Sequence, residues 1–111
     1  MPVAKAREFT AREKNVARLA KALSHPARVA ILAILAKRNE CICGEIVEVL
    51  PLAQATVSQH LKELKSVGLI KGEIDGPRSC YCINPDVVRE YSTLLGKFLE
   101  NVQVSCQPGK C

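Results

Sequence analysis

Aromatic side chains are scarce in this chain of 111 residues, which contains two Phe, two Tyr and no Trp. Proteins that bind single-stranded nucleic acid without sequence preference stack successive bases on aromatic side chains. Four aromatic residues are too few for a platform of that kind. The composition therefore argues against a single-strand-binding protein.

Long apolar runs and redox motifs are also missing. No uninterrupted apolar segment is long enough to span a bilayer, and residues 1–8 contain no apolar run typical of a secretory signal peptide. We therefore expect a cytoplasmic protein with no membrane partner. The chain has no Cys-x-x-Cys pair and no strand–helix–strand pattern, so we expect neither a thiol oxidoreductase nor another enzyme.

Six cysteines are the most conspicuous residues that are present, and they stand at positions 41, 43, 80, 82, 106 and 111. In a reducing cytosol, paired cysteines are more often metal ligands or redox groups than a disulfide framework. The formal net charge of +5 favours a polyanionic partner such as nucleic acid, although solvated lysines alone could produce it. The length and the 48% hydrophobic fraction predict one small domain with a core.

Hydrophobic periodicity predicts three helices in the first half of the chain. Apolar residues repeat at helical spacing over residues 9–23, and Ser24-His25-Pro26 then marks a break and a restart. We expect His25 to cap the new helix rather than to bind a metal. Residues 27–37 are apolar nearly all round, which is typical of a central buried helix. A short helix over about residues 43–50 should follow and stop near Pro51.

A further helix begins at Gln54 and separates into two faces when its residues are placed at 100° intervals. Val57, Leu61 and Leu64 fall on the inward face, which His60 borders as a packed or hydrogen-bonded side chain rather than a ligand. The outward face carries small and amide side chains with one lysine, namely Ala55, Ser58, Gln59, Lys62 and Ser66. This composition suits entry into a DNA groove, whereas long charged side chains alone would indicate a solvated face.

Two strands and a last helix complete the pattern. Gly68 is placed to end the preceding helix in a left-handed cap, and residues 69–74 and 78–83 then form a hairpin around Asp75-Gly76-Pro77. A helix with a wide apolar stripe opens at Asn84. The predicted fold class is therefore mainly α with a β-hairpin: a winged helix-turn-helix with flanking N- and C-terminal helices.

The domain organisation follows from the apolar surface of the terminal helices. Residues 1–104 should form one DNA-binding and dimerisation domain, and residues 105–111 a flexible tail that contains Cys106 and the accessory thiol Cys111. The terminal helices carry more apolar surface than one small monomer can cover. We therefore expect a homodimer that is joined through these helices.

Four segments together resemble the ArsR/SmtB family of metalloregulatory repressors: residues 23–32, 41–46, 56–64 and 67–70. Each segment alone would be a weak match, whereas the set is specific. The resemblance implies a homodimer that binds an inverted-repeat operator in double-stranded DNA. It also implies that the operator is released when a thiophilic ion or another inducer binds.

The Cys41-Ile42-Cys43 segment looks like the arsenic and antimony site of the family, so the resemblance implies As(III) or Sb(III) as inducer and no organic cofactor. Thiolates suit such soft ions. The arsenic branch often has a third cysteine where this chain has Ile46, and we expect Cys106 of the same chain or of the other protomer to supply the third sulfur. A Cd(II) or Pb(II) sensor is an alternative, although residues 1–40 lack the cysteines of the cadmium branch. Residues 86–102 contain no histidine, which argues against the site of the zinc branch.

The pattern leaves several roles of the cysteines open. On a helix, Cys41 and Cys43 would point to nearly opposite sides, so they could share one ion only if that first turn were irregular. Cys80 and Cys82 alternate onto one face of a strand, where they could form an accessory site or fill the core. A redox-sensing repressor is the other interpretation, in which Cys41 or Cys43 forms a disulfide or polysulfide link with Cys106, as the family's persulfide-sensing branch implies.

We expect the DNA-contacting residues on the outward helix face and on the hairpin. The candidates are Gln54, Thr56, Ser58, Gln59, Lys62, Lys71 and Arg78. An amide can pair bidentately with adenine, so Gln59 is the candidate for base reading, while Lys62 and Arg78 should contact phosphates. Family members often have Ser where this chain has Ala53, so the N-cap of this helix should be weaker than usual.

Overall fold

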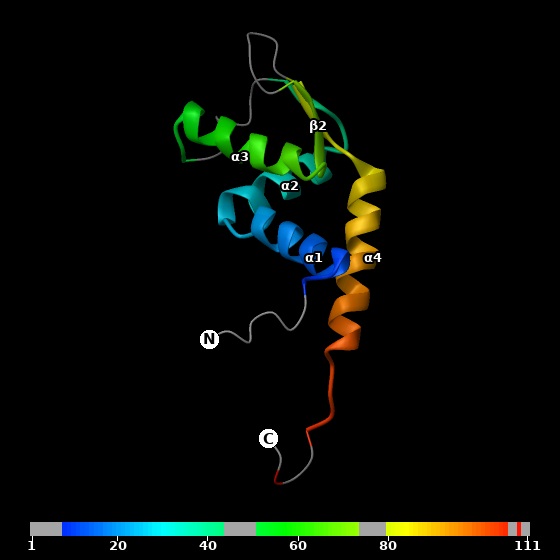
Figure 1. Cartoon of the computed structure of the whole chain (residues 1–111). Helices are drawn as coiled ribbons and strands as arrows, with labels where there is room; N and C mark the ends of the chain where they lie inside the picture. Colours follow the sequence, from blue (N-terminus) through cyan, green and yellow to red (C-terminus); the bar gives the residue numbers. More distant parts are fainter. Residues whose placement is uncertain (1–7, 44–50, 74–79, 107–108, 110–111) are drawn as a thin grey trace.

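The computed structural model describes residues 8–43, 51–73, 80–106 and 109. Within them the chain has four helices and a three-stranded antiparallel sheet (Figure 1). The helices are α1 (Ala11–Ala22), α2 (Pro26–Arg38), α3 (Gln54–Ser66) and α4 (Pro85–Asn101), and the strands are β1 (Ile42–Cys43), β2 (Ile70–Glu73) and β3 (Cys80–Ile83). The predicted winged helix-turn-helix, mainly α with a flanking helix at each end, is confirmed.

The helices begin where the sequence places capping residues. Thr10 caps α1 in a capping box, and Asn84 caps α4. The Nδ1 atom of His25 accepts a hydrogen bond from the backbone N–H of Ala27 at 3.0 Å, so the predicted capping role of His25 is confirmed. Helix α3 starts after Ala53 without a side-chain cap, also as predicted.

A sharp bend at Ser24 separates α1 from α2, and the two helices meet at 87°. The hydroxyl of Ser24 donates a hydrogen bond to the carbonyl of Lys21 at 2.6 Å, and the guanidinium of Arg28 donates to the same carbonyl at 2.9 Å. In the described part of the chain no single helix is long and apolar enough to cross a membrane. Helices α1 and α2 reach that length and composition only as this bent pair.

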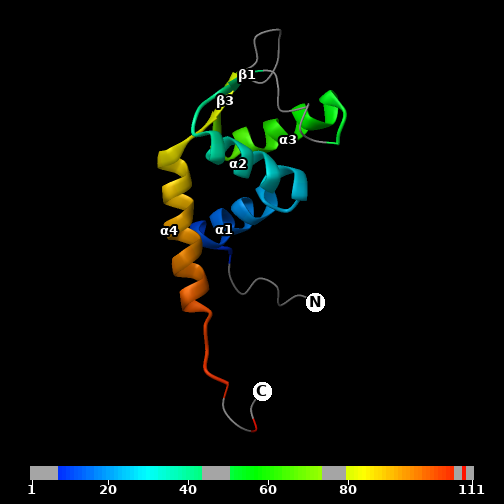
Figure 2. The same cartoon turned by 180° about the vertical axis from the view of Figure 1, so that it is seen from behind.

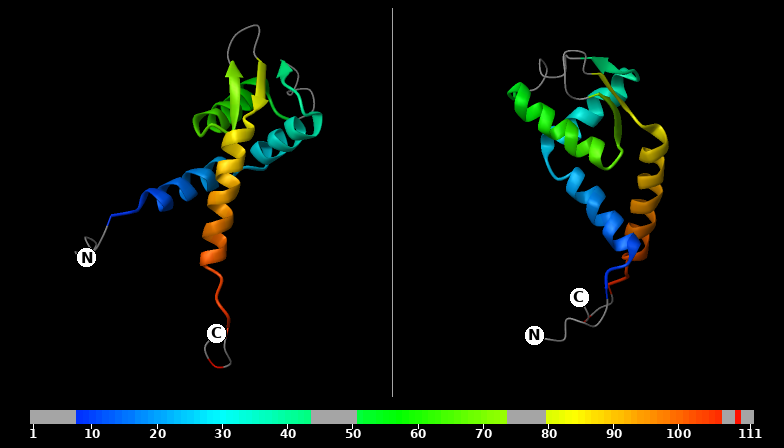
Figure 3. Two further views of the ribbon diagram at one scale, coloured as in Figure 1. Left: turned by 90° about the vertical axis from the view of Figure 1, so that its right-hand side faces the viewer. Right: turned by 45° about the horizontal axis from the view of Figure 1, so that its top comes forward.

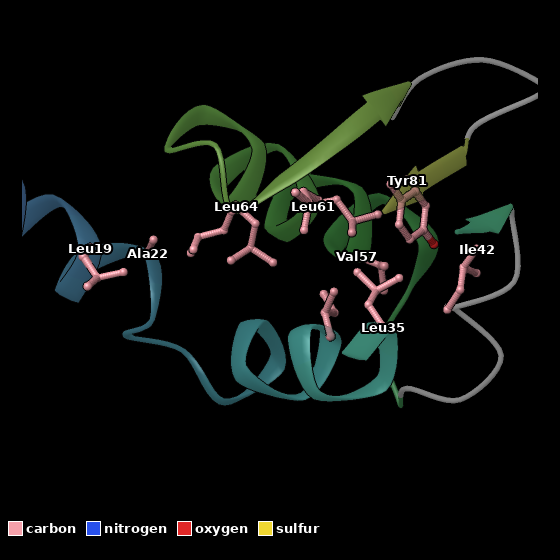
Figure 4. Packing of buried hydrophobic residues seen from close by; sticks show 11 residues of the cluster. Leu19, Ala22, Leu35, Ile42, Val57, Leu61, Leu64 and Tyr81 are labelled. Atoms are coloured by element: carbon pink, nitrogen blue, oxygen red, sulfur yellow. The ribbon is translucent and has the colours of Figure 1, made fainter. Parts of the chain in front are cut away.

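The hydrophobic core lies where α2, α3 and the inner face of the sheet meet (Figure 4). Its buried side chains are Leu19, Ala22, Ile31, Leu35, Ile42, Val57, Leu61, Leu64, Leu69, Ile70 and Tyr81. Ile31 and Leu35 are the most deeply buried residues of α2, which is therefore the central helix, as predicted. The helix is not buried all round, however, because the packed elements cover one stripe and leave Val29 51% exposed.

Gly68 turns the chain from α3 into the hairpin. Its φ angle is 83°, a left-handed conformation that glycine adopts without steric cost. The N–H of Gly68 donates to the carbonyl of Lys65 at 2.9 Å, and the N–H of Leu69 donates to the carbonyl of Leu64 at 3.1 Å. These two bonds form a Schellman motif, so the predicted left-handed cap is confirmed. The cap fixes, relative to α3, the start of the wing, which is the hairpin formed by β2 and β3.

The sheet has the strand order β1-β3-β2, so β3 lies in its centre. Figure 2 shows β1 and β3 together at one end of the molecule, beyond the start of α4. Strand β1 pairs with β3 in antiparallel register, with Ile42 opposite Tyr81 and Cys43 opposite Cys80. The prediction that Cys43 begins a helix is therefore wrong, and residues 44–50 of that predicted helix lie outside the described residues. The physical reason is burial: in the strand, Ile42 turns inward and is only 3% exposed.

Helix α4 runs away from the sheet and packs against α1 (Figure 3). None of its residues is fully buried within one chain, although the helix carries the apolar stripe predicted from the sequence. Val88 near the start of α4 is 36% exposed, and Leu99 and Val102 at its end are 49% and 53% exposed. The monomer thus leaves apolar surface uncovered along α4.

We predict that Gly72→Ala destabilises the fold by about 2 kcal/mol or more. Gly72 has a φ angle of 126°, and a Cβ atom there would collide with the backbone carbonyl oxygen of Cys80 on the paired strand. Urea unfolding followed by circular dichroism measures the change in the free energy of unfolding.

The matched control is Gly96→Ala on α4, where the added methyl group would meet no described atom beyond the adjacent backbone of its own helix within 4 Å. Alanine has a higher helix propensity than glycine, so this variant should be as stable as the parent chain or more stable by up to about 1 kcal/mol. Equal destabilisation by both substitutions would contradict the steric explanation for Gly72.

Candidate functional site

Helix α3 presents a polar face outward and an apolar face to the core. Val57, Leu61 and Leu64 are buried, as predicted, and point toward α2 (Figure 4). On the other side Thr56, Gln59 and Lys62 are exposed, whereas Ser58 is half-buried. Gln54 is the first residue of the helix. The exposed polar face of a helix that lies at the edge of the molecule has the shape and chemistry needed to enter a major groove.

The wing carries the other predicted DNA contacts. Lys71 lies on β2 and is exposed. Arg78 lies outside the described residues. Because α3 packs against β2, the exposed face of α3 and Lys71 belong to one connected unit of the fold.

His60 supports α3 from behind. Its side chain is buried, and its Nδ1 atom accepts a hydrogen bond from Nε of Arg28 at 3.2 Å. The ring centroids of His60 and His25 are 4.3 Å apart. Burial lowers the pKa of His60, and the nearby His25 and Arg28 lower it further, so the ring stays neutral and keeps its acceptor. The prediction that His60 is a packed, hydrogen-bonded histidine is confirmed.

Four cysteines meet on the sheet. The register of β1 and β3 brings Cys41 next to Cys82 and Cys43 next to Cys80, with Cα–Cα distances of 4.3 Å and 4.0 Å. Each pair is joined by a disulfide. Because residues i and i+2 of a strand point to the same side, all four sulfurs lie on one face. We call these four residues the sulfur cluster.

The sulfur cluster lies on the outer face of the sheet. Between its members, Ile42 and Tyr81 point the other way and are only 3% and 2% exposed. Cys41 and Cys43 are exposed, and Cys80 and Cys82 are half-buried.

Two expectations about the sulfur cluster are corrected by this arrangement. Cys41 and Cys43 do not diverge, because they flank Ile42 on a strand rather than on a helical turn. Tyr81, not Cys80 or Cys82, fills the core under the wing. The signal in the sequence was the matching alternation of Cys-Ile-Cys and Cys-Tyr-Cys, which fits two half-buried strands.

Charged side chains of β2 lie beside the sulfur cluster. In the register of β2 and β3, Lys71 is opposite Cys82 and Glu73 is opposite Cys80. A hollow of about 400 Å³ lies beside the Cys41–Cys82 pair, and its lining includes Cys41, Cys82 and Lys71. The sulfurs of one cysteine pair are therefore accessible to a small ion from solvent.

Cys106 lies far from the sulfur cluster of its own chain. It is exposed and follows α4, whereas β3 precedes α4, and the views agree that the sheet and the tail are at opposite ends of this helix (Figures 1 and 3). The 17 residues of α4 span about 25 Å at 1.5 Å per residue. The structure therefore does not bring Cys106 of the same chain together with Cys41 and Cys43. Cys111 lies outside the described residues.

The disulfide form is not the form that binds a metal. Among the residues described in the structure, no group of three or more His, Cys, Asp or Glu side chains is arranged to hold a metal ion. The sulfur cluster does not form such a group because its sulfurs are bonded to each other in disulfides, and a metal ion binds the thiolate rather than the disulfide. Reduction of the two bonds would present four thiols on one face.

The sequence is similar to those of known transcriptional regulators. Residues 23–73 match the family described as a helix-turn-helix domain. The HTH-type transcriptional regulator YgaV of Escherichia coli K12 is 33% identical over 81 residues, which are 73% of this chain and 82% of that protein. The arsenical resistance operon repressor of Staphylococcus xylosus is 28% identical over 98 residues, which are 88% of this chain and 89% of that protein.

A solved structure shows the same fold. The crystal structure of an ArsR family transcriptional regulator superposes with a TM-score of 0.66 at 18% identity, over 82% of this chain and 99% of that chain. The winged helix-turn-helix, the outward polar face of α3 and the similarity to these regulators agree. The chain belongs to the ArsR/SmtB family of helix-turn-helix transcriptional regulators, which bind DNA and are not enzymes.

Proposed function

We propose that this regulator is a repressor that leaves its operator when As(III) or Sb(III) binds the thiolates of Cys41 and Cys43. The observation that carries the proposal is the position of these two cysteines, which lie on one strand face directly before the segment that leads into α3. Soft thiolates suit these ions. The similarity to an arsenical resistance operon repressor supports the same class of inducer.

The site can act on DNA binding because β1 lies between α2 and α3 along the chain. Strand β1 follows α2, and ten residues separate Cys43 from Gln54 at the start of α3. An ion bound at Cys41 and Cys43 would constrain β1, ten residues before α3. Inducer and operator would then weaken each other's binding by the same factor.

On the DNA, we infer that α3 lies in the major groove and that the wing contacts the backbone. Gln59 and Lys62 are exposed on α3, and Lys71 is exposed on β2. Gln59 would read a base edge, whereas Lys62 and Lys71 would contact phosphates.

We also infer that the regulator is a homodimer on an inverted-repeat operator. A hollow of about 300 Å³ with almost purely apolar walls runs between α4 and the core, and Val88, Tyr91 and Leu95 line it. Exposed Leu99 and Val102 extend this apolar surface along α4. A second copy of the chain would cover it, and the twofold symmetry of such a dimer matches an inverted repeat.

Oxidation is the second candidate trigger, and the two disulfides of the sulfur cluster favour it. In that case a polysulfide or another thiol oxidant, rather than a bound ion, would release the operator. This version links Cys41 and Cys43 to the wing and not to Cys106. Cd(II) or Pb(II) in place of As(III) is a further alternative for the ion.

We predict that Cys41→Ser/Cys43→Ser keeps operator affinity and loses release by arsenite. Fluorescence anisotropy of a labelled operator measures both, with the protein reduced by a phosphine, which supplies no competing sulfur. Parallel titrations with Cd(II), Pb(II) and a polysulfide donor identify the trigger, and the phosphine is removed before the polysulfide is added because it would consume it. Release of the double variant by arsenite would rule out these two ligands, and release of the parent chain by polysulfide alone would favour the redox trigger.

Lys62→Ala should weaken operator binding to a similar extent on specific and unrelated DNA. A lost phosphate contact also flattens the dependence of log Kd on log salt by about one. Gln59→Ala is the matched variant on the same helix, and it should instead reduce the preference for the operator. If Lys62→Ala changed sequence preference while leaving the salt slope intact, the phosphate assignment would be wrong.

The dimer prediction is tested with Leu99→Asp, which places a charge on the exposed apolar stripe of α4. We expect a monomer in analytical ultracentrifugation and a loss of tight operator binding. The control is Thr93→Asp, which puts the same charge on an exposed position about 120° round the helix from Leu99. A Leu99→Asp protein that stays dimeric would contradict the proposed interface.

A further inference from the structure

We propose that Cys80 and Cys82 of the wing complete the inducer site, so that one thiophilic ion is held by sulfurs from β1 and β3 of the same chain. This inference rests on the proposed sensing of such an ion by Cys41 and Cys43, and it identifies the missing ligands. It replaces Cys106 as the source of the third sulfur. It also makes the wing part of the sensor.

The positions of the four Cα atoms fit a single ion. The two cross-strand Cα–Cα distances are 4.3 Å and 4.0 Å, and cysteines two residues apart on a strand are separated by about 6.7 Å. The centre of this rectangle lies about 4 Å from each Cα atom in the plane of the sheet. A thiolate reaches a metal at about 2.3 Å from sulfur, so an ion a few ångströms above the centre is within reach of all four side chains.

The strands are held in place without the sulfurs. Ile42 and Tyr81, which alternate with the cysteines, are buried in the core on the opposite face. The register of β1 and β3 is therefore fixed by packing, because a slip of β1 by one residue would turn Ile42 to solvent. The reduced chain keeps its four thiols together, which lowers the entropic cost of binding.

The number of bound sulfurs should depend on the ion. Trivalent arsenic forms three bonds: arsenous acid loses three hydroxyl groups, three As–S bonds replace three As–O bonds, and the three thiol protons leave in three water molecules. No atom changes its oxidation state in this exchange. Cd(II) accepts four thiolates in a tetrahedral arrangement, as Zn(II) does in sites with four cysteines.

The decisive experiment compares two double variants that each remove two cysteines. Cys80→Ser/Cys82→Ser removes the wing sulfurs, and Cys106→Ser/Cys111→Ser removes the same number from the tail. The full chain is reduced with a phosphine, given one equivalent of Cd(II) or arsenite, and alkylated, and mass spectrometry then counts the protected thiols. Competition with a chelating dithiol gives the affinity for arsenite.

For the parent chain and the tail variant we expect four thiols protected by Cd(II) and three by arsenite. For the wing variant we expect two, with a loss of affinity of about 100-fold or more, since removing a direct ligand should cost at least as much as removing a supporting group. Circular dichroism checks folding. If the double variant is unfolded, Cys80→Ser and Cys82→Ser are used singly, and each should reduce the Cd(II) count from four to three.

Two results would overturn the inference while leaving the proposed function intact: a wing variant that binds like the parent chain, or a tail variant that loses affinity. In either case Cys41→Ser/Cys43→Ser would still abolish binding. A parent chain that binds neither ion in its reduced form would instead refute the proposed function itself. The experiment therefore separates the two failures.

Discussion

The pairing of β1 with β3 is the constraint on which the candidate sensor depends. Ile42 and Tyr81 face each other across the two strands and are both buried in the core. Because side chains alternate along a strand, burial of this pair turns Cys41, Cys43 and the two wing cysteines outward together. A slip of β1 by one residue would turn Cys41 and Cys43 inward and expose Ile42. The hydrophobic core thus fixes the geometry of the sulfur chemistry.

The same core also supports α3, the helix proposed to enter the major groove. Val57, Leu61 and Leu64 hold α3 against α2, and neutral His60 adds a hydrogen bond from Arg28 of α2. The sulfur cluster and α3 are therefore anchored on neighbouring parts of one packed unit. Coupling between them requires an element with two arrangements that both sites favour differently. The segment between β1 and α3 is the element that connects them along the chain.

Most of the fold could be predicted because its signals are local. His25-Pro26, Gly68 and Asn84-Pro85 mark helix ends through capping chemistry, and the 3.6-residue period identifies the inward side of α3. Strand β1 could not be predicted in this way, since two residues carry no period and its partner β3 lies 37 residues further along the chain. The candidate site was likewise predictable only in its local part. Cys41 and Cys43 were proposed as ligands from the sequence, whereas their proximity to the wing depends on a long-range pairing. Cys106 was proposed as the third sulfur donor from its position after the last helix, and the length of α4 separates it from them.

The position of Lys71 suggests how an ion on the sheet could influence DNA binding at short range. Lys71 is opposite Cys82, so the proposed phosphate contact and the sulfur cluster share one face of the sheet. Cd(II) bound by four thiolates carries a net charge of −2, which would offset the attraction of Lys71 for a phosphate nearby. As(III) bound by three thiolates is neutral and has no such effect. If arsenite is the inducer, as proposed, it would therefore act through geometry, by fixing β1, whereas a divalent ion in the same site would add an electrostatic contribution that salt screens.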